Sequence, residues 1–120
     1  MEKKTLVLGA STNPGRYSNI AIKRLVSHKQ PTVAIGLREG EVAGVEIAKN
    51  EVDFEDVDTI TLYLNPQNQK RYYDYILSLE PKRVIFNPGT ENPELYALLR
   101  KNNIEIEVAC TLVMLATNQY

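Results

Sequence analysis

Residues 5–26, TLVLGASTNPGRYSNIAIKRLV, give the clearest indication of the fold. It starts with an apolar run, residues 5–8, that ends at Gly9. A small, polar loop then leads into residues 18–29, where apolar side chains recur four positions apart on one side, as in an amphipathic helix. A buried strand, a tight turn and a helix in this order predict the start of a strand–helix–strand unit.

The same rhythm repeats along the rest of the chain. Apolar runs predict four more strands, at residues 32–35, 59–64, 83–86 and 104–109. Two further helices are predicted at residues 67–79 and 92–101, the second with Asn92 as N-cap and Pro93 at its first position. Between residues 37 and 57 we expect a loop around Gly40 and Gly44, a short extended piece at 45–47 and a helical turn at 54–57.

Apolar strands separated by helices belong in a parallel sheet that is covered on both faces. Because crossover connections are right-handed, the predicted arrangement is a doubly wound sheet. We therefore expect residues 1–120 to form one Rossmann-like α/β domain with a five-stranded parallel sheet and helices on both faces. In such sheets ligands bind beyond the carboxyl ends of the strands, close to the point where the strand order reverses.

The bulk composition is that of a globular, soluble protein, with 43% hydrophobic and 24% charged residues. A formal net charge of −1 gives no reason to expect a nucleic-acid partner. No stretch approaches the roughly 20 apolar residues that span a bilayer, and no signal peptide is recognisable. The single cysteine, Cys110, cannot form an internal disulfide, so we expect a cytoplasmic protein with no membrane partner.

The loop after the first strand carries the strongest functional signal. Gly9 has no Cβ, so a phosphate group could approach its backbone closely. Ser11, Thr12 and Ser18 offer hydroxyl groups, and Arg16 offers a charged donor fork. The helix that follows presents free N–H groups to the same place. These features predict a phosphate site, although a turn of this kind needs small and capping residues whatever it binds.

The end of the second strand reads Gly36-Leu37-Arg38. A domain that binds NAD usually has an acidic residue here, some ~20 residues past the glycine loop. Arg38 suits instead a ribose that carries a phosphate, as in NADP or coenzyme A. The alternative is an arginine that is simply solvated in a loop.

Two more strand ends carry turns, Leu64-Asn65-Pro66 and Asn87-Pro88-Gly89. Both are predicted to lie at the edge where ligands bind, and Gly89 could bring backbone amides up to a ligand. Connections between strands and helices favour the same residues without any ligand.

Reactive side chains are few. The only histidine, His28, lies near the end of the first helix, away from the predicted ligand edge, and the acidic run at residues 53–58 reads as a solvated turn rather than a metal site. Cys110 directly follows the fifth strand; it is either a buried, inert thiol or one placed to exchange with the thiol of a ligand. Tyr73 or Tyr75, off the inward side of its helix, is a candidate for a homodimer contact.

Three motifs together resemble the small CoA-binding-domain proteins, which are similar to the N-terminal domain of the succinyl-CoA synthetase alpha subunit. They are the strand followed by Gly9-Ala10-Ser11, the helix start Arg16-Tyr17-Ser18 and the turn Asn87-Pro88-Gly89. The resemblance runs from Lys4 to about Thr117. The family often has a Pro-Lys pair where this chain has Leu37-Arg38.

The resemblance implies that CoA lies across the strand ends. Its phosphates would be lined by Gly9, Ala10, Ser11, Thr12, Arg16 and Tyr17. Its adenosine would lie near Gly36, Leu37 and Arg38. The nucleotide and pantetheine arm would be flanked by Leu64, Asn65, Pro66, Asn87, Pro88 and Gly89.

We therefore expect a stand-alone module that binds coenzyme A or acyl-CoA without catalysis of its own. The histidine-bearing domain that gives the synthetase its phosphoryl chemistry has no counterpart in these 120 residues. A separate catalytic chain is a candidate partner, and a homodimer is a second. The alternative function is a small NADP-dependent oxidoreductase.

Overall fold

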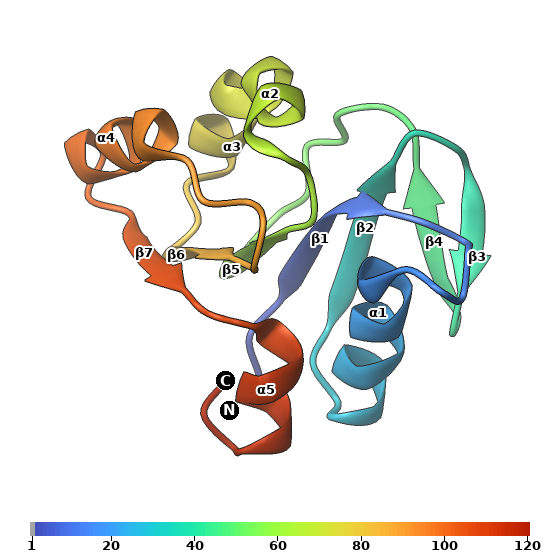
Figure 1. Ribbon diagram of the computed structural model, residues 1–120. Coiled ribbons are helices and arrows are strands. Elements are labelled where there is room, and N and C mark those ends of the chain that lie inside the picture. The colour runs from blue at the N-terminus through green and yellow to red at the C-terminus, as the bar shows by residue number, and fades with distance from the viewer. Residues whose placement is uncertain (1) are drawn as a thin grey trace.

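The computed structural model describes residues 2–120 and contains one seven-stranded sheet (Figure 1). The strands lie in the order β3-β4-β2-β1-β5-β6-β7. Their bounds are β1 Thr5–Ala10, β2 Thr32–Gly36, β3 Gly40–Val42, β4 Val45–Ala48, β5 Thr59–Leu62, β6 Arg83–Phe86 and β7 Glu105–Val108. The helices are α1 Tyr17–Ser27, α2 Pro66–Gln69, the 3-10 turn η1 Lys70–Tyr72, α3 Tyr73–Leu79, α4 Pro93–Lys101 and α5 Thr111–Ala116.

Neighbouring strands run parallel except β3 and β4, which pair antiparallel, and the strand order reverses at β1. From β1 the chain builds outward through β2 and β4, then returns to pair β5 with the other side of β1 and continues to β6 and β7. The carboxyl ends of β2, β1, β5, β6 and β7 consequently lie along one edge of the sheet, which we call the carboxyl edge. The α/β class and the Rossmann-like winding are those that the sequence predicts.

The prediction of five strands, all parallel, was wrong, because residues 40–48 add an antiparallel hairpin at the sheet's edge. Its turn is made by Ala43 and Gly44, both with positive φ, the backbone geometry that suits the twist of a two-residue hairpin. The extended piece expected at 45–47 is β4, whereas Gly40 begins β3 rather than a loop. The helical turn expected at 54–57 does not form, and residues 49–58 cross the sheet without regular structure.

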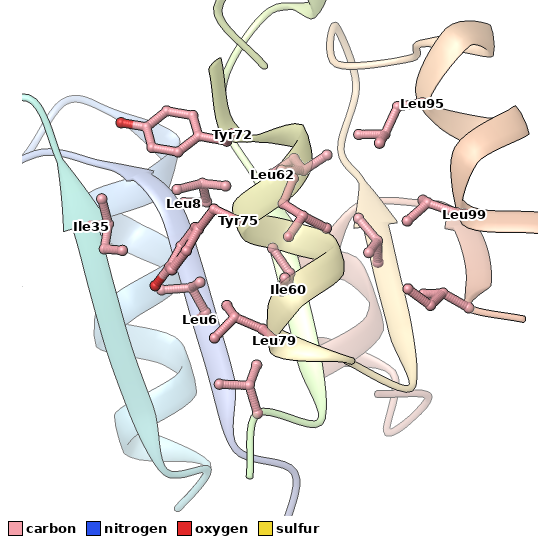
Figure 2. Close-up of a cluster of buried hydrophobic side chains, with 14 of the residues drawn as sticks. Leu6, Leu8, Ile35, Ile60, Leu62, Tyr72, Tyr75, Leu79, Leu95 and Leu99 are labelled. Atoms are coloured by element: carbon pink, nitrogen blue, oxygen red, sulfur yellow. The ribbon is translucent and has the colours of Figure 1, made fainter. Parts of the chain in front are cut away.

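Two apolar clusters fill the two sides of the sheet. On one side, side chains of α1 and α5, such as Ile22 and Leu115, pack over β1, β2 and the β3–β4 hairpin. On the other side, α3 and α4 cover the sheet, and Figure 2 shows Leu95 and Leu99 of α4 pointing toward β6. Helices on both faces are thus confirmed.

The helix predicted at 67–79 consists of three pieces, α2, η1 and α3. Tyr72 and Tyr75 are both buried, and Figure 2 shows them against the same cluster. Tyr75 is only 6% exposed, and its hydroxyl donates to the carbonyl oxygen of Val52. Tyr75 therefore presents little surface to a second copy, and Tyr73, half-buried, donates to Glu94 within the chain. That one of these tyrosines contacts a second copy stays a prediction.

Helix α5 was not predicted. It begins after Cys110 and buries Thr111, Met114 and Leu115, and it lies alongside α1 (Figure 1). Met114 and Leu115 therefore complete the core on the α1 side. Of the helices in residues 2–120, none has the length and apolar character needed to cross a membrane.

Candidate functional site

The β1–α1 loop lies where the strand order reverses, and its own side chains hold its shape. The hydroxyl of Ser11 accepts a hydrogen bond from the backbone N–H of Asn13 at 3.1 Å. The side-chain oxygen of Asn13 accepts from the N–H of Gly15 at 2.9 Å. Asn19, buried in the first turn of α1, donates to the carbonyl oxygen of Ser11 at 3.0 Å. The loop is therefore ordered by its own hydrogen bonds.

Helix α1 starts without a side-chain cap. Its N-cap residue, Arg16, makes no capping hydrogen bond, whereas Asn65 and Asn92 cap α2 and α4 with their side chains. The first N–H groups of a helix carry partial positive charge and accept an anion readily. Arg16 is itself exposed, so a positive charge and the start of an eleven-residue helix meet at the carboxyl edge.

Two of the three glycines of the predicted site, Gly9 and Gly36, are required by the packing of the strands. Gly9 has φ +100°, and a Cβ there would lie 3.0 Å from the backbone of Tyr63. At Gly36 a Cβ would lie 2.2 Å from the carbonyl oxygen of Ala10. That Gly9 lets a phosphate approach its backbone stays a prediction. The atoms that the structure places close to Gly9 are those of Tyr63 and Leu64 in the same chain.

The part of the carboxyl edge near the starts of α1 and the β2–β3 loop also carries exposed apolar side chains. Tyr17 at the start of α1 is 71% exposed and Leu37 after β2 is 72% exposed, and Arg38 is exposed beside it. A Cβ at Gly40 would lie 2.4 Å from Cγ2 of Thr12, so the β3–β4 hairpin abuts the β1–α1 loop. The sequence patterns did not reveal this contact, because they predicted a loop around Gly40 and no hairpin.

The remaining residues of the predicted site differ in how far they are exposed. Ser18 and Ala10 are buried, while Thr12, Asn65, Pro88 and Gly89 are exposed. Leu64 and Pro66 are half-buried. Pro88 and Gly89 thus lie at the surface of the carboxyl edge, with Gly89 at φ +91° and its N–H bonded to Glu91.

Asn87 is a buried brace between three elements. Its Nδ2 donates to the hydroxyl of Thr61 at 2.6 Å and to the carbonyl oxygen of Leu62 at 2.9 Å. Its Oδ1 accepts from the N–H of Thr111 at 2.9 Å, which caps α5 from outside the helix. Since both ends of the amide are used within the chain, this geometry gives Asn87 a structural role at the edge.

Chemically active groups near the edge are Cys110 and Tyr63. Cys110 is half-buried and immediately precedes α5. Burial raises the pKa of Tyr63 to about 12, so its hydroxyl keeps its proton at neutral pH. His28 lies at the opposite end of α1, as predicted. No group of three or more His, Cys, Asp or Glu side chains within residues 2–120 is arranged to hold a metal ion.

Two open hollows, of about 580 and 350 Å³, lie at the other edge of the sheet, where the strands begin. The larger one is lined by residues of mixed charge, such as Lys4, Asp58 and Lys82. Residues before the strand starts line both, so neither hollow belongs to the predicted ligand site.

These observations describe a Rossmann-like α/β domain whose loops and uncapped first helix gather at the carboxyl edge. The chain belongs to the CoA binding domain family, whose model matches residues 3–116. No curated protein matches the chain.

The chain is also similar to several solved structures. A crystal structure described as that of an uncharacterized protein is 52% identical, with 100% of this chain and 99% of that chain covered and a TM-score of 0.97. A hypothetical protein from Pyrococcus horikoshii is 23% identical, with 98% and 84% covered and a TM-score of 0.86. A protein from Thermus thermophilus is 20% identical, with 99% and 91% covered and a TM-score of 0.86. The last two likenesses show a shared fold.

Proposed function

We propose that this chain binds coenzyme A or an acyl-CoA at its carboxyl edge. The observation that carries the proposal is the uncapped start of α1 beside Arg16, at the reversal of the strand order, in a chain of the CoA binding domain family. An anion is the natural partner of such a helix end, and ligands of doubly wound sheets bind at this position.

We assign each part of the ligand to the part of the carboxyl edge whose chemical character suits it. The diphosphate lies against the β1–α1 loop, where the N–H groups at the start of α1 and the guanidinium of Arg16 supply positive charge. The phosphorylated ribose lies near Arg38. The exposed side chains of Tyr17 and Leu37 provide apolar surface for the adenosine. The pantetheine arm crosses the exposed turn at Pro88 and Gly89.

In the proposed function the protein is a binding module that acts as a carrier, a sensor or the partner of a separate catalytic chain. We favour coenzyme A over NADP because the family model is that of a CoA binding domain. A homodimer remains compatible with the proposal, and the ligand site as proposed needs residues of one chain.

The test is a titration of the folded protein with CoA, acetyl-CoA, 3′-phospho-ADP and NADPH, followed by calorimetry and by thermal unfolding. A ligand that binds only the folded state raises the melting temperature when it is well above its Kd. Arg16→Ala and Arg38→Ala should each weaken CoA binding by about 1.5–3 kcal/mol, or roughly tenfold to a hundredfold. Arg100→Ala, which removes an exposed charge from α4, is the matched control.

A melting curve that millimolar CoA, acetyl-CoA and 3′-phospho-ADP all leave unchanged would contradict the proposal. Tighter binding of NADPH than of CoA would favour the oxidoreductase instead.

A further inference from the structure

Gln69, at the end of α2, is fully buried and uses both ends of its side-chain amide. Its Nε2 donates to the carbonyl oxygen of Leu64 and to that of Thr90, each at 2.8 Å. Its Oε1 accepts from Nδ2 of Asn92 at 2.9 Å. A buried amide with these partners is held in one orientation, since no other rotamer would satisfy the same groups.

The two carbonyl groups belong to different strand ends. Leu64 lies in the segment that follows β5, and Thr90 lies in the turn that follows β6. One side chain therefore spans two adjacent loops of the carboxyl edge. Both donors of the Gln69 amide are spent on this link.

The link reaches the exposed part of the second loop through Thr90. The hydroxyl of Thr90 donates to the carbonyl oxygen of Asn87 at 2.7 Å, and its N–H donates to the same oxygen at 3.0 Å. These two bonds close the turn that carries Pro88 and Gly89. A displacement of Thr90 would therefore move this turn relative to Leu64.

We propose that Gln69 is a positioning residue that fixes the separation of the β5 and β6 loops, and with it the affinity for the pantetheine arm of the ligand. This inference rests on the proposed function, because the proposed function assigns the pantetheine arm to the turn at Pro88 and Gly89 in the β6 loop. Gln69 acts through the carbonyl groups that it holds and does not touch the ligand. A small shift of a positioned loop is enough to weaken the contacts that depend on it.

Gln69→Glu tests the proposal with a change of nearly the same shape. A carboxylate at this position has no hydrogen to donate and faces two carbonyl oxygens, so the loops should separate. Burial raises the pKa of a carboxyl group, and the protonated form regains one donor. CoA binding should therefore be weakened about tenfold near pH 8 and recover as the pH falls toward about 5.

The control is Gln67→Glu, the same substitution on the exposed side of α2, which should bind CoA as the wild type does at every pH. The other titratable groups of this network are Tyr73 and Glu94, which the hydrogen bonds of Asn92 and Tyr73 connect to Gln69. Burial raises the pKa of the Tyr73 hydroxyl, so it stays protonated over this range.

The fragment 3′-phospho-ADP, which lacks the pantetheine arm, separates positioning from general damage. Its affinity should be the same for the wild type and for Gln69→Glu at both ends of the pH range. Gln69→Met, which is neutral and of similar length, should show the same selective loss for CoA without recovery at low pH. It also replaces Gln69→Glu if that variant does not fold.

Two results would overturn the inference. One is wild-type CoA affinity in both Gln69 variants; the other is an equal loss of CoA and 3′-phospho-ADP binding, which would mean a merely structural residue. If the wild type binds neither compound, the proposed function itself fails, and this inference fails with it.

Discussion

Replacing Asn87 by alanine should destabilise the fold more than it weakens ligand binding directly. The side chain is 2% exposed and bonds Thr61, Leu62 and Thr111. The hydroxyl of Thr61 keeps a partner, because it lies 2.8 Å from the hydroxyl of Thr111. The carbonyl of Leu62 and the N–H of Thr111 lose the amide, and a buried polar group without its partner costs about 1–3 kcal/mol.

We therefore expect Asn87→Ala to lower the free energy of unfolding by about 3 kcal/mol and the melting temperature by roughly 10 °C. Urea unfolding of the free protein measures the first quantity. The control is Asn65→Ala, which removes an exposed N-cap and should cost about 1 kcal/mol. If Asn87→Ala is as stable as the control but no longer binds CoA, Asn87 is a ligand contact and the brace described above is wrong.

Three further predictions concern single residues. Gly36→Ala should destabilise the fold strongly, because its Cβ would lie 2.2 Å from the carbonyl oxygen of Ala10. Gly89→Ala meets no atom within 4 Å and should lower the free energy of unfolding by only about 1 kcal/mol, because of its positive φ. Chemical unfolding compares the two variants, and equal losses of stability would contradict this prediction. The pKa of Tyr63 is raised from 10.0 to about 12 in the folded state, so its contribution to stability is present below pH 10 and lost as the pH rises toward 12. Tyr63→Phe should therefore reduce the loss of stability at alkaline pH. An unchanged profile of stability against pH would refute this prediction. Cys110, half-buried at the carboxyl edge, should form a mixed disulfide with CoA under mild oxidation. Intact-mass spectrometry detects the adduct, which Cys110→Ser must abolish. Absence of the adduct in the wild type would mean that Cys110 does not exchange with the thiol of the ligand.

The parallel part of the sheet could be predicted because its strands are apolar along their whole length. Residues 83–86 and the helix capped by Asn92 were predicted with their observed bounds, since apolar runs and capping residues leave few alternatives. The β3–β4 hairpin was harder, because β3 has three residues and one side of each strand is exposed. Helix α5 was missed because its six residues are too few to show a helical period and no capping side chain marks its start.

The sequence predicted where the candidate site lies, but not which role each of its residues has. The patterns predicted which strand ends carry small and polar residues, and the topology brings them to one edge. They could not distinguish the exposed Pro88 from the buried Asn87, its neighbour. Nor did they single out Gln69, because a glutamine near the start of the helix predicted at residues 67–79 is typical of an exposed position. Burial of an amide depends on neighbours that are distant in sequence.

A crystal structure of the protein soaked with CoA would show whether the carboxyl edge is a ligand site. We predict density for the diphosphate at the start of α1 beside Arg16, and for the pantetheine arm extending toward Gly89. Density confined to the opposite edge, between Lys4 and Lys82, would contradict this prediction.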